Sequence, residues 1–303
     1  MKSLIIFFII TYVFTLENKE HHQKIVETVN NFNNFKTTWK AQLNQRDYTS
    51  LINTLKSIPE IEYPEKITFK ASNEDLPESY DLREAFSQCE SVNEIKDDTQ
   101  CPASWAYGAI ETMNDRICIH SKGQLQTKLS LLYLITCCTK CGTGCTGGGF
   151  ISSAFEFWKN NGIPSESEYE EHIDKFEDNV DPPTCDNKYQ NEDKSYAKSV
   201  YSVKGEQNMM KEIYENGSIE GTFTVYEDFL DYKSGIYQHI TGASLGGLAI
   251  KIIGWGITDT GIKYWTVANC WGTNWGERGF FRIIRGKNEC GIEEVANTGI
   301  PKL

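Results

Sequence analysis

The sequence predicts an α+β protein in which a helical half and a strand-rich half meet at a cleft. Apolar residues recur at helical spacing in the first half, whereas strand-like runs dominate the second half. Ten cysteines all lie between Cys89 and Cys290, which separates a cysteine-free leader from a cross-linked domain. A chain of 303 residues can bury one sizeable domain or two smaller ones. We therefore expect two subdomains rather than a single layer.

Residues 1–17 have the pattern of a secretory signal peptide. Lys2 precedes an apolar run over residues 4–14, and polar residues follow from Glu17. The run is shorter than the roughly 20 residues that span a bilayer, and no later segment is long and apolar enough to do so. The alternative is a buried N-terminal helix. We expect entry into the secretory pathway, with an extracellular or lysosomal/vacuolar location and no membrane span.

The charge balance argues against two classes of partner. The chain carries 42 acidic and 30 basic residues, a net charge of −12. Nonspecific binding to nucleic acid or to an anionic membrane requires the opposite sign, so neither is expected. Residues 165–181 hold eight acidic side chains, and such a run is typical of a solvated loop.

Helices are expected before strands along the chain. In the leader, Ile25, Val29, Phe32, Phe35 and Trp39 predict an amphipathic helix over 25–39, and Leu51 with Leu55 predicts a second short helix. Beyond Pro77 we expect helices over 105–119, 129–135 and 150–158, the first with Glu111, Asn114 and Asp115 opposite its apolar face. Strands are expected over 221–226, 248–254, 264–269 and 280–284.

Ten cysteines in a secreted chain are interpreted as disulfides. Cys137, Cys138, Cys141 and Cys145 are spaced too tightly for an ordinary zinc site and have no nearby histidine, so no metal is expected. No cofactor is expected either.

Several ordered motifs resemble the papain family of cysteine proteases (peptidase C1), and the cathepsin B-like branch in particular. The match spans nearly the whole chain. The family landmarks are residues 101–108, 137–148, 246–250 and 269–272, and the stretches similar to cathepsin B are 115–120, 232–239 and 290–293.

The resemblance implies a domain plan and a set of disulfides. A papain-like domain would cover residues 76–303, with a helical left subdomain and an antiparallel β-rich right subdomain. A short helical inhibitory prosegment would cover 18–75 and occupy the cleft as an intramolecular ligand. The implied disulfides are Cys89–Cys118, Cys101–Cys145, Cys138–Cys141 and Cys137–Cys185. Cys270 and Cys290 belong to none of these implied disulfides.

The nucleophile position of this family is occupied by Ser104. Serine is a weak nucleophile unless a base takes its proton. The alternative interpretation is structural, since a serine that opens a helix at Trp105 is a favourable N-cap.

The general-base position is occupied by Leu248, within Gly246-Gly247-Leu248-Ala249, where the family has histidine. Leucine cannot exchange a proton. After the leader only His120, His172 and His239 remain, and none is a good substitute, although rescue by His239 stays open.

Asp98 occupies the oxyanion position, where the family has glutamine. A carboxylate there repels the negative charge that develops in the transition state, and the loss of one oxyanion donor alone costs on the order of 10²–10³ in rate. Pro102 replaces a glycine of the nucleophile loop and removes an N–H. The orienting asparagine is retained as Asn269. Cys270 beside it is interpreted as a buried small side chain, and the alternative is a relocated nucleophile.

Cleft positions are also implied by the resemblance. Gly147 and Gly148 would offer backbone groups to an extended peptide, Trp271 would flank the asparagine, and Val295 would line an apolar specificity pocket. The region of the occluding loop is acidic, with His172 alone in place of a histidine pair. Asn216-Gly217-Ser218 is a weak glycosylation signal.

The sequence therefore predicts a catalytically inactive homologue that binds a peptide or protein in its cleft. One alternative is an active papain-family endopeptidase that uses Ser104 or Cys270 with an unrecognised base. The other is a secreted structural or matrix-type protein that acts through its acidic surface.

Overall fold

The structure is a computed structural model that describes residues 18–32, 38–44, 48, 51–52, 55, 76–145, 148–169, 185 and 194–303. The expected signal peptide, Gly147, His172 and most of the acidic stretch lie outside these residues.

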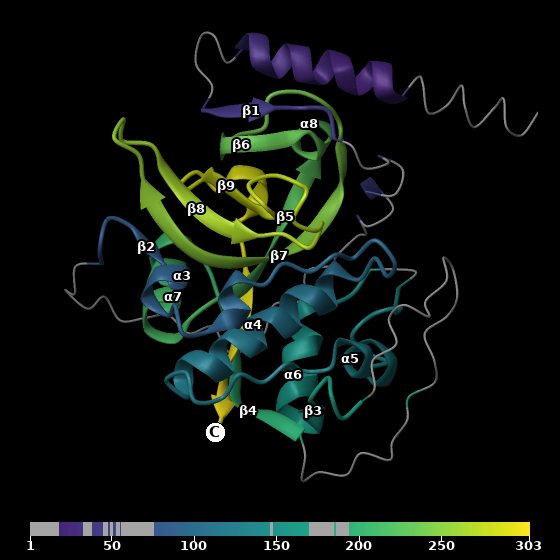
Figure 1. The fold of residues 1–303 in the computed structure, drawn as a ribbon, viewed down its shortest axis with the longest axis vertical. Helices are drawn as coiled ribbons and strands as arrows, with labels where there is room; N and C mark the ends of the chain where they lie inside the picture. The colour runs from purple at the N-terminus through teal and green to yellow at the C-terminus, as the bar shows by residue number, and fades with distance from the viewer. Residues whose placement is uncertain are drawn as a thin grey trace, which may run out of the picture.

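The fold is α+β, as predicted, with a helical half below a curved sheet (Figure 1). The helical half contains α4 (Ser104–His120), α5 (Leu131–Cys137) and α6 (Ile151–Asn161), which match the three helices that the sequence predicts. The shorter α3 (Leu82–Ala85) and the 3-10 helix η1 (Glu90–Asn93) precede them. α7 (Glu206–Asn216) and α8 (Glu227–Leu230) interrupt the later strands, and η4 (Glu289–Gly291) precedes the last one.

The described strands form one sheet in the order β1-β6-β9-β8-β7-β5-β10-β4-β3, with β2 paired to β7 off this path. All pairs are antiparallel except β6 with β9. In chain order the strands are β1 (Trp39–Ala41), β2 (Tyr80–Asp81), β3 (Ile163–Pro164), β4 (Lys194–Val203), β5 (Ile219–Tyr226), β6 (Tyr232–Tyr237), β7 (Ser244–Ile257), β8 (Lys263–Ala268), β9 (Phe280–Ile284) and β10 (Ala296–Lys302).

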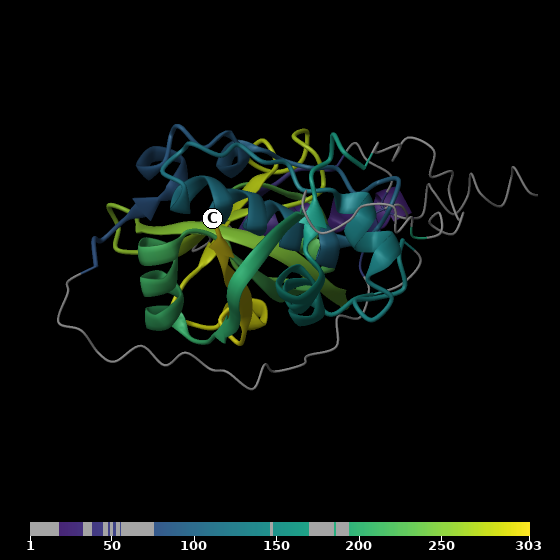
Figure 2. The same ribbon diagram turned by 90° about the horizontal axis from the view of Figure 1, so that it is seen from below.

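Helix α4 runs through the centre of the molecule. Every residue of α4 except His120 is buried, because one face packs on α5 and α6 and another packs on β7 and β10. Figure 2 shows this helix from below, between the helical layer and the long strands. The sequence placed Glu111, Asn114 and Asp115 on an opposite, polar face, yet all three are buried. Two of them bond to other elements: Asn114 Oδ1 accepts from the Leu129 N–H at 3.0 Å, and Asp115 Oδ2 accepts from the Ser218 hydroxyl at 2.8 Å.

The predicted leader helix over 25–39 is wrong in its second half. The helix covers residues 18–32, and Trp39 begins strand β1 instead. Trp39 pairs with Gly235 of β6, and its indole N–H donates to the Gln238 carbonyl at 2.9 Å. Its ring lies 5.0 Å from that of Tyr237. Tertiary contacts with the sheet therefore override the helical spacing, and Phe32 is left exposed.

The four disulfides join the cysteines that the resemblance implies: Cys89 to Cys118, Cys101 to Cys145, Cys137 to Cys185 and Cys138 to Cys141. All but Cys137–Cys185 lie within the helical half and the loops that precede α4 and α6. Cys270 and Cys290 are free thiols, and burial raises the pKa of the Cys290 thiol.

Candidate functional site

Ser104 is the first residue of α4 and is buried against β7. Its hydroxyl accepts a hydrogen bond from the backbone N–H of Ala249 at 3.3 Å. The N-cap of the helix is Ala103, which makes no side-chain capping bond. The expected N-cap role of Ser104 is therefore wrong, because Ser104 lies inside the first turn and its hydroxyl bonds to the adjacent strand.

Leu248 lies one residue before Ala249 in β7. Its side chain is fully buried, and its register partner across the sheet is Phe223 of β5. The hydrogen bond between Ser104 and Ala249 thus brings together the two predicted positions from α4 and β7. At this point α4 contributes a hydroxyl, and β7 contributes an apolar side chain where the family has histidine.

Asp98, Asn269 and Cys270 form the second part of the site. The Asp98 N–H donates to the Cys270 carbonyl at 2.9 Å, and the Cys270 thiol donates to Asp98 Oδ2 at 3.4 Å. Asn269 Oδ1 accepts from the Cys270 N–H at 2.8 Å. The Asn269 Nδ2 atom is buried and has no hydrogen-bond partner among the described residues. Within the described residues, the Asn269 side chain is thus held through its oxygen atom, by a backbone N–H, and not through its nitrogen atom.

Each histidine in the described part of the chain contacts a group away from Ser104. His239 Nδ1 lies 3.1 Å from Asp228 Oδ1, and its ring stacks on Tyr226 with centroids 3.8 Å apart. His120 lies 3.2 Å from the Asn216 carbonyl oxygen, and burial lowers its pKa. His21 and His22 contact Glu227 and Asp231.

The predicted cleft residues have separate surroundings. Trp271 is buried, with its ring 5.1 Å from Trp275, and the residue beside it, Gly272, donates its N–H to the Lys96 carbonyl. Val295 is half-buried immediately before β10. The Gly148 carbonyl accepts from the Thr143 N–H at 3.3 Å, so one of its backbone groups is already used.

Comparison with known proteins decides the family. The family model described as papain family cysteine protease matches residues 76–300.

The chain belongs to the papain family of cysteine proteases.

Relatives of this papain-family chain are cathepsin B-like. Cathepsin B-like cysteine proteinase 6 of Caenorhabditis elegans is 43% identical over 258 residues, which cover 76% of this chain and 68% of that protein. Cathepsin B-like cysteine proteinase 4 of the same organism is 37% identical over 316 residues, which cover 92% of this chain and 93% of that protein. The solved structure of procathepsin B S9 from Trypanosoma congolense has a TM-score of 0.81 at 32% identity, and the match covers 92% of this chain and 97% of that one.

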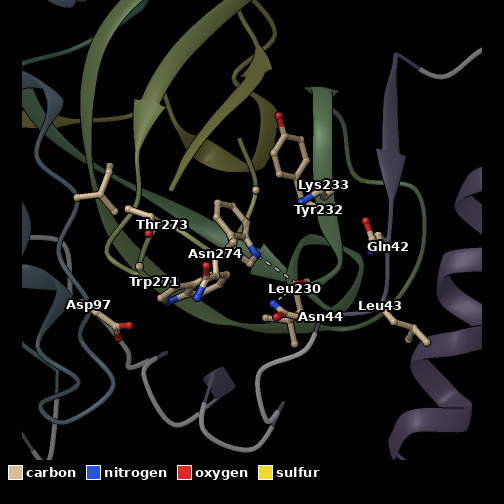
Figure 3. Close-up of a pocket in the computed structure, with 14 residues that line it drawn as sticks. Gln42, Leu43, Asn44, Asp97, Leu230, Tyr232, Lys233, Trp271, Thr273 and Asn274 are labelled. Carbon is tan, nitrogen blue, oxygen red and sulfur yellow. Dashed lines mark hydrogen bonds between the residues drawn. The ribbon is translucent and has the colours of Figure 1, made fainter. Parts of the chain in front are cut away.

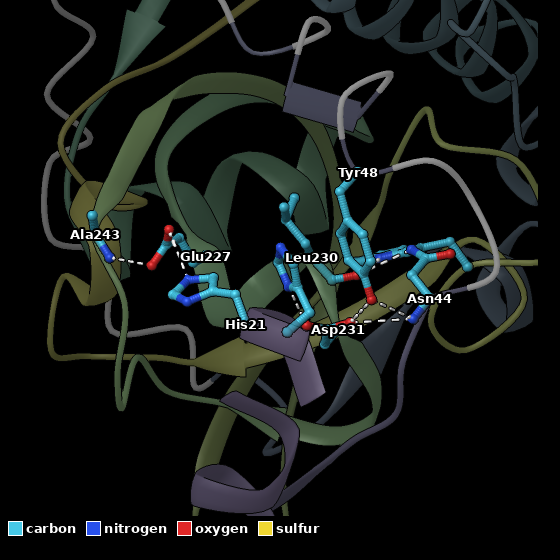
Figure 4. A network of polar contacts seen from close by, with 9 residues as sticks. His21, Asn44, Tyr48, Glu227, Leu230, Asp231 and Ala243 are labelled. Atoms are coloured by element: carbon cyan, nitrogen blue, oxygen red, sulfur yellow. Dashed lines mark hydrogen bonds and ion pairs between the residues drawn. The ribbon is translucent and has the colours of Figure 1, made fainter. Parts of the chain in front are cut away.

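The papain-family domain carries the N-terminal segment, residues 18–55 as far as they are described, on its strand-rich half. Figure 4 shows the polar contacts that hold it. Asp231 is buried at their centre: Oδ2 accepts from His22 Nδ1 at 2.7 Å, and Oδ1 accepts from the Tyr48 hydroxyl at 2.6 Å and from the Asn44 N–H at 3.1 Å. The rings of His22 and Tyr48 stack with centroids 3.6 Å apart. Burial and the contact with Asp231 raise the pKa of Tyr48.

The N-terminal segment also reaches strand β7 close to Leu248. The Leu55 Cβ lies 3.6 Å from the position that a Cβ on Gly246 would take, and Leu51 and Leu55 are both buried. At the other end β1 extends the sheet by pairing with β6. The segment therefore covers the domain from β6 to the strand that carries the general-base position.

A pocket of about 630 Å³ lies between the N-terminal segment and the loop after β8 (Figure 3). One side is formed by three residues of the N-terminal segment, Gln42, Leu43 and Asn44. The domain adds Leu230, Tyr232 and Lys233. Trp271, Thr273 and Asn274 line the opposite side, with Asp97 beside them. A volume in this range is typical of ligand sites.

The contacts of Asp231, Tyr48 and His22 were not predicted from sequence. Asp231 belongs to a short polar turn after α8 without any motif, and its partners are about 200 residues away along the chain, since His22 is 209 positions distant. Only the apolar character of Leu51 and Leu55 indicated that this part of the leader is buried. Among the described residues no helix is long and apolar enough to cross a membrane, and no cluster of three or more metal-binding side chains is found.

Proposed function

We propose that this chain is a catalytically inactive cathepsin B-like homologue that acts by binding a peptide or protein in its cleft. The observation that carries the proposal is the junction of Ser104 with β7. The Ser104 hydroxyl accepts a backbone N–H, and the residue beside that N–H is a fully buried leucine. A serine without a base is not a competent nucleophile.

The histidine contacts support this proposal. His239, the one candidate for rescue, lies between Asp228 and Tyr226 and does not approach Ser104. His120 at the other end of α4 contacts the Asn216 carbonyl. Activation of Ser104 would require one of these side chains to leave its present partner.

The Asp98 contacts are consistent with a lost oxyanion site. Asp98 is buried, and its carboxylate accepts from the Cys270 thiol rather than offering a donor to a substrate. This contact also argues against Cys270 as a relocated nucleophile, since a carboxylate next to a thiol disfavours the thiolate.

We propose that residues 18–75 act as a prosegment, residues 1–17 as a signal peptide and residues 76–303 as the domain. The four disulfides favour a secretory route, either extracellular or lysosomal. An inactive chain cannot remove its own prosegment, so the cleft opens only after cleavage by another protease. Until then the pocket beside Trp271 is the accessible part of the cleft (Figure 3).

The binding claim is tested with an immobilised peptide library on two forms of the protein, intact and cut between residues 56 and 75. We expect saturable binding that increases after the cut and that Trp271→Ala weakens. Ile262→Ala, in the turn before β8, is the matched control. Absence of saturable binding in both forms would contradict the peptide-binding function and would favour action through the acidic surface.

A further inference from the structure

A second, smaller pocket lies beside α4 and shares Asp97 with the larger pocket. Its volume is about 130 Å³. Tyr107 and Ile110 of α4 form its inner wall together with Leu129 and Leu131. All four are buried, so this part of the pocket wall is apolar.

A buried carboxyl group, that of Glu111, belongs to the lining of this pocket. Glu111 lines the pocket next to Ile110 and is only 4% exposed. Its Oε1 atom is buried and has no hydrogen-bond partner among the described residues. A buried carboxylate without a partner is costly, so this position needs either a proton or a counter-ion.

The two lysines around Glu111 are already paired with other carboxylates. Lys96, at the rim of the pocket, lies with its Nζ 2.8 Å from Glu94 Oε1. Lys251 of β7 lies behind Glu111, with its Nζ 3.1 Å from Asp115 Oδ2. Glu220 of β5 is a further buried carboxylate that faces Glu111, and both of its oxygens lack a partner within the described chain. The surroundings of Glu111 are therefore short of positive charge.

We propose that this pocket binds an alkylammonium group, the side chain of a lysine from a partner protein, with the Glu111 carboxylate as its counter-ion. The methylene groups of a lysine match the apolar walls, and its ammonium would pair with Glu111. Glu166 and Asp97 also line the pocket and add negative charge. The pocket shares Asp97 with the larger one but takes a different ligand, so the inference goes beyond the function proposed for the cleft.

Binding is coupled to a proton. The pKa of Glu111 is raised from its usual 4.5 to about 7, mainly by burial, while Lys251 and Lys96 lower it and Asp115 and Glu94 raise it. Below that pH the entering ammonium meets a carboxylic acid, which ionises on contact and releases its proton to the solvent. The ammonium itself stays protonated up to about pH 10. We therefore expect the affinity to rise with pH, about tenfold per unit, until Glu111 is ionised in the free protein.

The test uses n-butylammonium chloride as the probe on the full chain, followed through the methyl NMR signals of Ile110, Leu129 and Leu131. We expect saturable shifts with a Kd on the order of 1 mM near neutral pH, which is plausible for so small a ligand. At a pH about one unit below 7, calorimetry in two buffers should detect the released proton. Butanol, which is neutral and of similar shape, should bind at least about tenfold more weakly.

Two variants complete the test. Glu111→Gln removes the counter-ion and should abolish both the pH dependence and the preference over butanol. Glu168→Gln, on the exposed turn near Glu166, is the matched control and should change neither. The proposal is overturned if the wild-type chain shows no saturable shifts, or if butanol and butylammonium shift the same signals equally. The wild-type titrations decide this even if Glu111→Gln does not fold.

Discussion

At the scale of the residue, three buried side chains occupy the positions that we propose have lost their catalytic groups. Ser104 is a hydrogen-bond acceptor for Ala249, Leu248 faces Phe223, and Asp98 accepts from Cys270. Each of these three side chains packs against a neighbour or makes a hydrogen bond to one. Among the described residues none of these contacts gives Ser104 a base, so chemistry at this point would need an added base.

Restoring two of these residues tests this account. In Ser104→Cys alone, we expect a thiol with an ordinary pKa that reacts slowly with iodoacetamide at mildly acidic pH. In Ser104→Cys/Leu248→His, an adjacent imidazole should stabilise the thiolate and accelerate alkylation by about tenfold or more. Mass spectrometry identifies the modified residue and separates it from Cys270 and Cys290. Equal, fast alkylation in the single variant would mean that a base is already present.

At the scale of the element, the sequence predicted the central helices and four strands, because their apolar residues recur at helix or strand spacing. It missed β4, β6, β10 and α7, whose burial depends on neighbours distant along the chain. Trp39 shows the same limit: its spacing fits a helix, but pairing with Gly235 makes it a strand residue. In the structure Ser104 bonds to Ala249, the neighbour of Leu248, and the expected cap role of Ser104 is wrong because the helix begins at Ser104 rather than at Trp105.

The docking of the N-terminal segment depends on Asp231. Asp231→Ala removes the acceptor of the buried His22 and Tyr48 donors and one of the two acceptors of the Asn44 N–H, which should weaken docking by about 3 kcal/mol. We expect hydrogen exchange of the amides in residues 18–32 to increase by more than about tenfold, while α4 stays protected. Asp259→Ala, in an exposed turn, should have no such effect. Unchanged protection of residues 18–32 would mean that β1 and Trp39 hold the segment without this network.

At the scale of the whole molecule, the two halves meet over buried charges. Lys251 of β7 pairs with Asp115 of α4 at 3.1 Å, and Glu111 of α4 and Glu220 of β5 are two further buried carboxyl groups. Burial raises the pKa of Glu220 well above its usual value, and the pKa of Glu111 to about 7. Both carboxyl groups therefore stay protonated to a higher pH in the folded chain than in the unfolded chain.

This difference predicts a molecule that is most stable in acid. A carboxyl group whose folded pKa is raised contributes fully below its unfolded pKa, and the contribution is lost as pH rises toward the folded pKa. Between about pH 4.5 and 7 the free energy of unfolding should fall by roughly 3 kcal/mol through Glu111 alone. Urea denaturation with intact disulfides measures this, and Glu111→Gln should flatten the curve. Stability that stays constant or increases over this range would contradict the assignment.

The central claim is that this papain-family chain does not cut peptides. The most direct measurement is hydrolysis of a diverse peptide-amide library by the purified chain, after its N-terminal segment has been cut and separated, compared with Ser104→Ala prepared in the same way. We predict that both proteins give the same background rate. Turnover by the wild-type chain that disappears in Ser104→Ala would contradict the account and would make Ser104 a working nucleophile.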